Sequence, residues 1–184
     1  MLLRRERPGD AEAVRRVHAL AFATADLGGA PVPEAGLVDA LRSGGHIVPA
    51  CSIVAVEGDA VVGHVVCSRA SVGESMGVGE SMGTEPAQVL GLGPLGVLPD
   101  RQSRGVGSAL MHAVLAAADA CDVAAVVLLG EPAYYRRFGF EPARRWGITP
   151  PDPSWERGFQ VRRLTAWDDR LHGEVRYAAP FHEL

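Results

Sequence analysis

The sequence lacks two residue types altogether, because it contains neither lysine nor asparagine and all 18 of its basic residues are arginine. Any chemistry that depends on a lysine amine is therefore excluded, including the nucleotide phosphate loop in which lysine precedes serine or threonine. No apolar run is long enough to span a bilayer, and the first residues lack the apolar stretch of a secretory signal. We therefore expect a cytoplasmic protein without a membrane partner.

Cysteine is scarce as well. Cys51, Cys67 and Cys121 are odd in number, far apart and flanked by apolar residues, which favours buried free thiols in a reducing compartment. Neither these cysteines nor the six histidines have the spacing of metal ligands, so we expect no metal site. The net charge of −4 gives no reason to expect a nucleic-acid partner.

Length and composition fit one soluble domain over residues 1–184, because 47% of the chain is apolar. The spacing of apolar residues predicts strands that alternate with helices, and hence a mixed α/β fold. Strands are predicted at residues 2–5, 52–56, 60–66, 89–97, 124–129, 159–164 and 174–178. Helices are predicted to start at residue 10 and to cover residues 34–42, 105–120 and 131–138, with Cys121 on the core face of the third.

A duplication interrupts this pattern at residues 72–83, which consist of two identical copies of Val-Gly-Glu-Ser-Met-Gly. Such a segment, rich in glycine and serine, is typical of a flexible loop. It is either an inert insertion or a lid over a substrate.

The most informative stretch runs from Val97 to Leu110, where an apolar segment ends, a polar turn follows and a helix begins. Unpaired amides at a helix start carry the positive end of the helix dipole and bind phosphate, and glycine lets a ligand approach the backbone closely. The stretch therefore predicts a pyrophosphate cradle. The run Gly91–Gly96 matches the letters of a dinucleotide-binding turn, but Val97-Leu98-Pro99 follows it instead of a helix, so we reject that reading.

The segment Gln102-Ser103-Arg104-Gly105-Val106-Gly107 resembles the acetyl-CoA pyrophosphate loop of the GCN5-related N-acetyltransferase superfamily. The segment Ala133–Phe140 resembles the helix that follows in that superfamily, with a tyrosine four residues before a Gly-Phe pair. The resemblance covers most of the chain and extends to a subgroup of predicted bacterial acetyltransferases.

The resemblance implies a central, mostly antiparallel sheet of six to seven strands with splayed middle strands, flanked by helices. It implies acetyl-CoA as cosubstrate, with a backbone N–H such as that of Val97 facing the thioester oxygen and Tyr135 protonating the leaving thiolate. The pantetheine arm would pair with the backbone of Leu95, Gly96 and Val97. The pyrophosphate would be held by Gln102, Ser103, Arg104, Gly105, Val106, Gly107 and Ser108.

The sequence says less about the acceptor of the acetyl group and about the base that deprotonates it. The segment Val89–Leu98 contains neither a carboxylate nor a histidine, so the general base is left open between Glu131, His64 and water. We expect the acceptor to be a primary amine of a small molecule or peptide, and the resemblance leaves room for a homodimer. The missing base also favours an alternative, a non-catalytic acyl-CoA-binding module.

Overall fold

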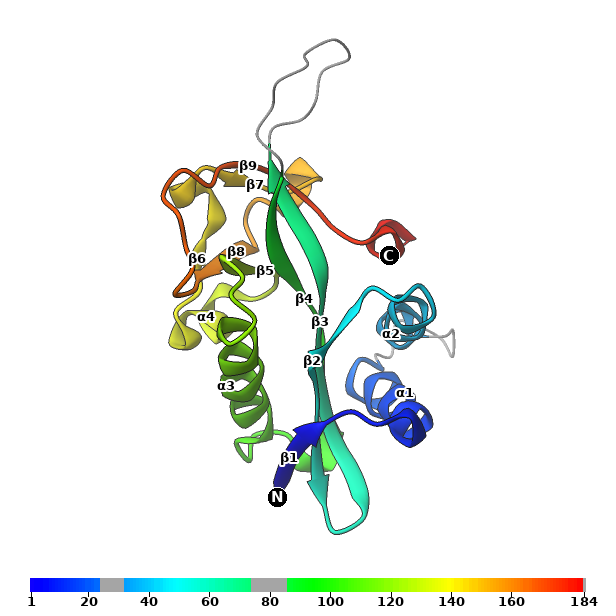
Figure 1. The fold of residues 1–184 in the computed structure, drawn as a ribbon. Coiled ribbons are helices and arrows are strands. Elements are labelled where there is room, and N and C mark those ends of the chain that lie inside the picture. The colour runs from blue at the N-terminus through cyan, green and yellow to red at the C-terminus, as the bar shows by residue number, and fades with distance from the viewer. Residues whose placement is uncertain (24–31, 74–85, 184) are drawn as a thin grey trace. The chain divides into compact units, whose positions relative to one another are not determined.

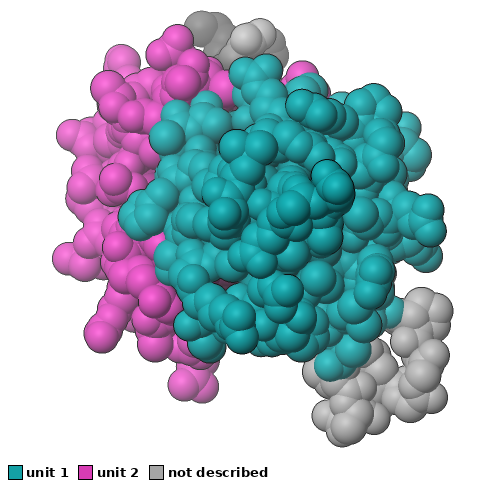
Figure 2. Space-filling model, turned by 90° about the horizontal axis from the view of Figure 1, so that it is seen from below, with its two compact units in different colours: residues 1–68, 92–117, 178–184 teal, residues 69–91, 118–177 magenta. Residues whose placement is uncertain are grey.

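The computed structural model describes residues 1–23, 32–73 and 86–183 (Figure 1). The chain forms two compact units (Figure 2). Unit 1 comprises Met1–Ser68, Leu92–Ala117 and Ala178–Leu184, and unit 2 comprises Arg69–Gly91 and Ala118–Tyr177. Two strands, β3 (Ala60–Gly73) and β4 (Ala87–Val97), contribute residues to both units. The extent of the single domain, residues 1–184, stays a prediction.

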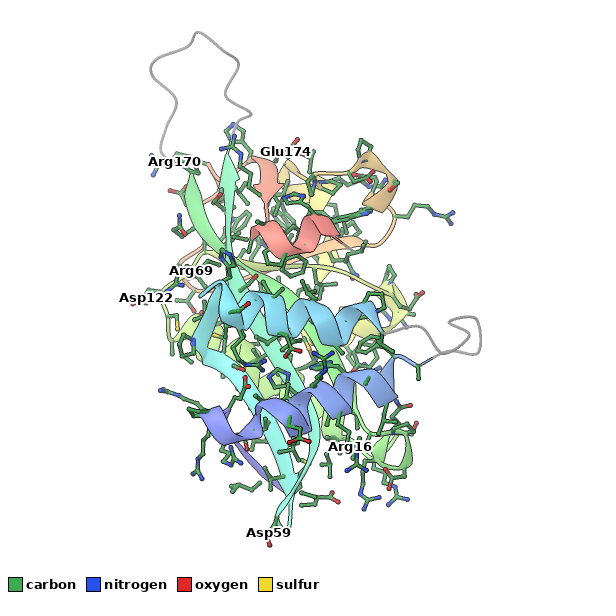
Figure 3. The ribbon with its side chains drawn as sticks, turned by 90° about the vertical axis from the view of Figure 1, so that its right-hand side faces the viewer. Arg16, Asp59, Arg69, Asp122, Arg170 and Glu174 are labelled. Carbon is green, nitrogen blue, oxygen red and sulfur yellow. The ribbon has the colours of Figure 1, made fainter. Side chains whose placement is uncertain are left out.

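The strands of unit 1 form an antiparallel ladder in which β1 (Leu2–Arg5) pairs with β2 (Ile47–Glu57) and β2 pairs with β3. The turn between β2 and β3 consists of Gly58 and Asp59, and Gly58 has a φ of +60°. Two-residue hairpin turns need positive φ values, which glycine adopts without steric cost. Asp59 therefore lies at the tip of a tight hairpin (Figure 3).

Helices flank these strands in unit 1. The helices α1 (Ala11–Ala21) and α2 (Pro33–Ser43) lie side by side, and α3 (Val106–Asp119) lies across the strands from them (Figures 1 and 3). Short 3₁₀ helices occur at Pro8–Asp10, Pro99–Arg101 and Ala179–Glu183, and the last of these packs near α2. One cluster of the buried core comprises Val14, Val38, Val54, Val56 and Val66.

Unit 2 is built around β5 (Ala125–Leu129), which pairs antiparallel with β8 (Phe159–Arg163). In the same unit β9 (Gly173–Arg176) pairs with the end of β3, and β4 pairs in parallel with β5 through Leu90 with Val126 and Gly91 with Val127. The helical elements are α4 (Pro132–Tyr135) and 3₁₀ helices at Arg136–Phe138, Ala143–Trp146 and Pro153–Trp155. Two short strands, β6 (Glu141–Pro142) and β7 (Ile148–Thr149), pair with β8 and β9 respectively.

The predicted fold class is confirmed, because the chain is a mixed α/β protein whose strands pair mostly antiparallel and are flanked by helices. The predicted strands and helices are all present. The sequence did not predict β6 and β7, because two residues are too few to establish an alternating pattern. Cys51 and Cys67 are buried, as expected.

Two local predictions differ from the structure. Cys121 is exposed, because α3 ends at Asp119 and the buried residue of its last turn is Ala118. The duplicated segment begins inside a strand, since Val72 and Gly73 belong to β3 and pair with β9, a long-range contact that composition cannot indicate. The rest of the duplication lies outside the described residues.

Candidate active site

The segment that follows β4 is held by hydrogen bonds to the end of the strand. The side-chain amide of Gln102 donates to the Val97 carbonyl at 3.1 Å, and the Arg101 amide donates to the Leu98 carbonyl at 2.8 Å. The Arg101 guanidinium is bound to Glu57 at 2.9 Å and to Asp100 at 2.5 Å. Gln102 and Arg101 thus both have partners within the protein. Gln102 holds the backbone of Val97, the residue whose N–H is predicted to face the thioester oxygen.

The loop then turns sharply into α3. Ser103 and Gly105 have φ values of 58° and 85°, and the left-handed conformation is the one that glycine adopts readily. The first bond of the helix joins the Ala109 amide to the Gly105 carbonyl at 2.9 Å, so the amides of Val106, Gly107 and Ser108 have no acceptor inside α3. Three unpaired amides at the positive end of a 14-residue helix suit a phosphate group.

The proposed proton donor, Tyr135, ends α4 in unit 2. Its ring packs edge-on against Phe140 and Tyr134, with centroids 5.8 Å and 4.9 Å away. Burial, together with the neighbouring Tyr134, raises the pKa of Tyr135 to about 12. The phenol therefore stays protonated at neutral pH. Phe138 and Phe140 are core residues.

Gly130, in the same unit, leaves space for the ring of Tyr135. A Cβ atom placed on Gly130 would lie 2.5 Å from Cε2 of Tyr135, closer than two carbon atoms approach. Gly130 is itself fixed, because its amide donates to Gly158 at 3.0 Å and its carbonyl accepts from Gln160 at 3.1 Å. The position of the phenol ring thus depends on the missing side chain at residue 130.

The two residues considered as the general base have partners of their own. The exposed Glu131 is the N-cap of α4, and its carboxylate accepts a hydrogen bond from the Ala133 amide at 3.1 Å. His64 is fully buried in unit 1, with Nδ1 2.8 Å from Nε2 of His18 and Nε2 3.0 Å from Oγ of Ser52.

Sequence reasoning missed His18, although its spacing offered a signal. His18 follows Val14 by one helical turn and is adjacent to Val17, so it belongs to the apolar stripe of α1 and is fully buried. An ionisable residue on such a stripe needs a polar partner from another element, and here that partner is His64.

Within residues 1–23, 32–73 and 86–183 there is no group of three or more histidine, cysteine, aspartate or glutamate residues that could hold a metal ion. None of the helices in these ranges is long and apolar enough to cross a membrane. The loop Gln102–Ser108, the end of β4 and the two histidines belong to unit 1, and Tyr135 belongs to unit 2.

The sequence matches the family model of the acetyltransferase (GNAT) domain over residues 49–142. It is 35% identical over 150 residues to the uncharacterised N-acetyltransferase YhbS of Escherichia coli K12, covering 82% of this chain and 81% of that protein. It is 31% identical over 175 residues to YjhQ, another uncharacterised N-acetyltransferase of E. coli K12, covering 93% of this chain and 88% of that one. These matches confirm the bacterial subgroup that the sequence resembles.

Solved structures agree with this assignment. The crystal structure of E. coli YhbS in complex with CoA superposes with a TM-score of 0.82 and 32% identity, covering 98% of this chain and 91% of that one. A GNAT family acetyltransferase from Brucella melitensis, in complex with acetyl-CoA, has a TM-score of 0.73 and 33% identity, covering 98% of this chain and 97% of that one. The chain therefore belongs to the GNAT family of acetyltransferases.

Proposed function

We propose that this protein transfers an acetyl group from acetyl-CoA to a primary amine of a small molecule or peptide. The observation that carries the proposal is the α3 start, where Val106, Gly107 and Ser108 have amides with no acceptor inside the helix directly after β4. The crystallised relatives from E. coli and B. melitensis hold CoA and acetyl-CoA respectively, and these cofactors fit such a loop. A homodimer stays a prediction, which light scattering can test.

The backbone of this chain would hold the donor along two stretches. The β4 residues Leu95, Gly96 and Val97 would pair with the pantetheine arm, and the Val97 N–H would donate to the thioester oxygen. One donor at a developing oxyanion is worth about 3 kcal/mol in the transition state. The pyrophosphate would be bound by Gln102, Ser103, Arg104, Gly105, Val106, Gly107 and Ser108.

The transfer is direct, without a covalent enzyme intermediate. The amine nitrogen attacks the thioester carbon, a C–N bond forms and the C–S bond breaks. Tyr135 gives its phenolic proton to the departing sulfur, and its pKa of about 12 keeps that proton in place until the sulfur becomes basic.

A calorimetric titration with acetyl-CoA tests the binding loop. In Gly107→Glu, a carboxylate at the helix start repels the pyrophosphate and fills the space above the amides, so we expect the affinity to fall about 100-fold or more. Gly36→Ala is the control, because a Cβ atom at residue 36 of α2 meets nothing within 4 Å. Unchanged affinity of the Gly107 variant would contradict the assignment of the loop.

Release of free CoA with a panel of amines tests the catalysis. Suitable probes are spermidine, tyramine, glycinamide and Nα-acetyllysine amide, which differ in size and charge. In Tyr135→Phe we expect turnover to fall about 100-fold, with the affinity for acetyl-CoA unchanged. Equal turnover of this variant and the wild type would remove Tyr135 from the role of acid. Tight binding of acetyl-CoA without transfer to any amine would favour the non-catalytic binding module.

A further inference from the structure

A chain of buried and half-buried polar side chains runs through unit 1, and each member comes from a different segment. His18 of α1 contacts His64 of β3 with 2.8 Å between Nε2 and Nδ1, and His64 contacts Ser52 of β2 with 3.0 Å between Nε2 and Oγ. Ser52 donates to Oε2 of Glu6, which follows β1 and lies 3.4 Å from Nε2 of His64. Arg42 of α2 closes the chain with a bond of 2.6 Å to the other Glu6 oxygen.

The direction of these hydrogen bonds follows from the charge of Glu6. Burial alone would raise the pKa of Glu6, but the nearby His64 ring and the hydrogen bonds from Ser52 and Arg42 lower it to about 2. An ionised carboxylate only accepts hydrogen bonds, so the Ser52 hydroxyl donates to it. The Ser52 oxygen is then left to accept the proton of His64 Nε2.

The same logic assigns the proton on each imidazole. Burial lowers the pKa of His64, and burial together with the nearby His64 lowers the pKa of His18 to about 3, so both rings are neutral at pH 7. A neutral imidazole has one donor and one acceptor nitrogen. Because His64 donates through Nε2, its Nδ1 accepts from Nε2 of His18. His18 Nδ1 is therefore an unprotonated nitrogen with a free lone pair.

This lone pair has no partner among the described residues, although His18 is fully buried. Leaving a buried polar atom unsatisfied costs about 1–3 kcal/mol, and such an exception calls for a functional explanation. The lone pair faces β4, because a Cβ atom placed on Gly96 would lie 2.8 Å from Nδ1 and 3.1 Å from Cε1 of His18. Nδ1 of His18 thus lies directly against the backbone of Gly96, and it can do so because residue 96 has no side chain.

We propose that His18 is the general base of the transfer, and that His64, Ser52 and Glu6 are positioning residues that orient it and carry the proton away. The inference rests on the proposed function, because Gly96 belongs to the stretch assigned to the pantetheine arm. In enzymes that remove a proton from a nucleophile, the base is usually oriented by a hydrogen bond to a further group. His18 supplies the base that the segment Val89–Leu98 lacks.

Each group of the relay that accepts a proton also passes one on. As the C–N bond forms, the amine proton moves to Nδ1 of His18, directly or through one water, and His18 passes its Nε2 proton to Nδ1 of His64. His64 passes its own Nε2 proton to Ser52, and Ser52 passes its proton to Glu6. Glu6 afterwards releases one proton to solvent, and Tyr135 takes one from solvent to replace the proton that it gave to sulfur. Both imidazoles then return from the Nδ1–H to the Nε2–H tautomer by proton exchange, which frees Nδ1 of His18 for the next turnover.

The charged groups around the relay act in opposite directions on a proton carried by either histidine. Glu6 favours the protonated form of both histidines, whereas Arg42 disfavours it, and Asp10 favours the protonated form of His64. Asp10 itself is neutralised by Arg4, with bonds of 2.6 Å and 2.9 Å. The carboxylate of Glu6 is therefore the group that balances a proton on His18.

Nitrogen NMR of the histidine-labelled wild-type protein tests the assignment without any assay of activity. We expect His18 and His64 both to be neutral at pH 7 and to carry their proton on Nε2, with signals identified from the His18→Gln and His64→Gln variants. A proton on Nδ1 of His18, or a cationic ring at pH 7, would overturn the proposal.

The pH dependence of kcat/KM then separates a base from a packing residue, with acetyl-CoA and the fastest amine of the panel as substrates. In His18→Gln the side-chain amide can still donate to His64 Nδ1, but the lone pair facing β4 is lost. We expect a loss of about 100-fold at pH 7 that shrinks towards pH 9, where hydroxide replaces the base, with the affinity for acetyl-CoA unchanged. The control is His112→Gln, which changes an exposed histidine of α3.

Two outcomes would overturn the role of His18. A loss of equal size at every pH would make it a packing residue, and no loss at all would show that another group takes the proton. A wild-type protein that binds acetyl-CoA but transfers to no amine would contradict the proposed function together with the base, whereas transfer that survives in His18→Gln at pH 7 contradicts the base alone.

Discussion

At the scale of single residues, two glycines make room for the side chains to which we assign proton transfer. Gly130 lies against the ring of Tyr135, and Gly96 lies against the imidazole of His18. In both places a Cβ atom would come within 3 Å of the neighbouring ring, so that ring would have to move. Hydrogen bonds to Gly158 and Gln160 fix the backbone at Gly130, which leaves the phenol as the group that shifts.

The substitution Gly130→Ala should therefore slow proton donation by Tyr135, although the phenol group itself is unchanged. A displacement of about 1 Å at a reacting group can cost about 100-fold in rate, so we expect kcat to fall by up to that factor while the affinity for acetyl-CoA is retained. Steady-state kinetics and calorimetry on the same preparation measure the two quantities. Unchanged kcat would mean that the position of the ring does not limit the reaction.

At the scale of elements, the contact between β3 and α3 sets where α3 begins. Gly63 of β3 lies under the first turns of α3, and a Cβ atom there would meet Leu110 at 3.0 Å, Val106 at 3.1 Å and the Gly96 carbonyl at 3.2 Å. The helix can approach the strand this closely because residue 63 has no side chain. The start of α3 is thus held against β3.

The substitution Gly63→Ala should destabilise the protein by about 1–3 kcal/mol, because a close-packed contact has no room for another carbon atom. Denaturant unfolding, followed by circular dichroism, measures the change. Gly36→Ala in α2 is the matched control, and we expect it to stabilise by about 0.5–1 kcal/mol, since alanine favours a helix and its Cβ atom meets nothing within 4 Å. Equal effects of the two changes would contradict the packing argument.

At the scale of the whole molecule, the buried relay couples folding to pH. The pKa of Glu6 is lowered to about 2, so its contribution to the free energy of unfolding is complete above the unfolded value of 4.5 and is lost as the pH falls towards 2. The pKa of His18 is lowered to about 3 and that of His64 is lowered as well, so the unfolded chain binds protons first as the pH falls below 6.5. All three groups therefore weaken the fold in acid.

We expect the free energy of unfolding to fall by about 2 kcal/mol between pH 7 and pH 5 through His18 alone, because one proton binds to the unfolded chain and none to the folded one. Urea unfolding at the two pH values measures this loss. His18→Gln should reduce the loss. An equal loss in the wild type and in His18→Gln would show that His18 does not stay neutral in the folded protein.

Several features of the fold and the site could be predicted from the sequence because they depend on neighbours in the chain. The strand, turn and helix around Gln102–Ser108 follow from apolar spacing and from glycine at the turn, and the same holds for the short helix that ends at Tyr135. Sequence patterns did not reveal the two-residue strands β6 and β7, since their pairing partners lie far away in the chain. The conformation of a segment can be predicted from the sequence where residues close together in the chain determine it.

The sequence by itself determined the family, the mixed α/β class and the position of the loop to which we assign the phosphate, because amides at a helix start are a local property of the backbone. Only the tertiary structure decided which side chains exchange protons. His18 and His64 are 46 residues apart and meet only after α1 packs on the strands, and Glu6 reaches them from the segment after β1. The pKa of a side chain depends on its burial and on the charges around it, and distant segments supply both.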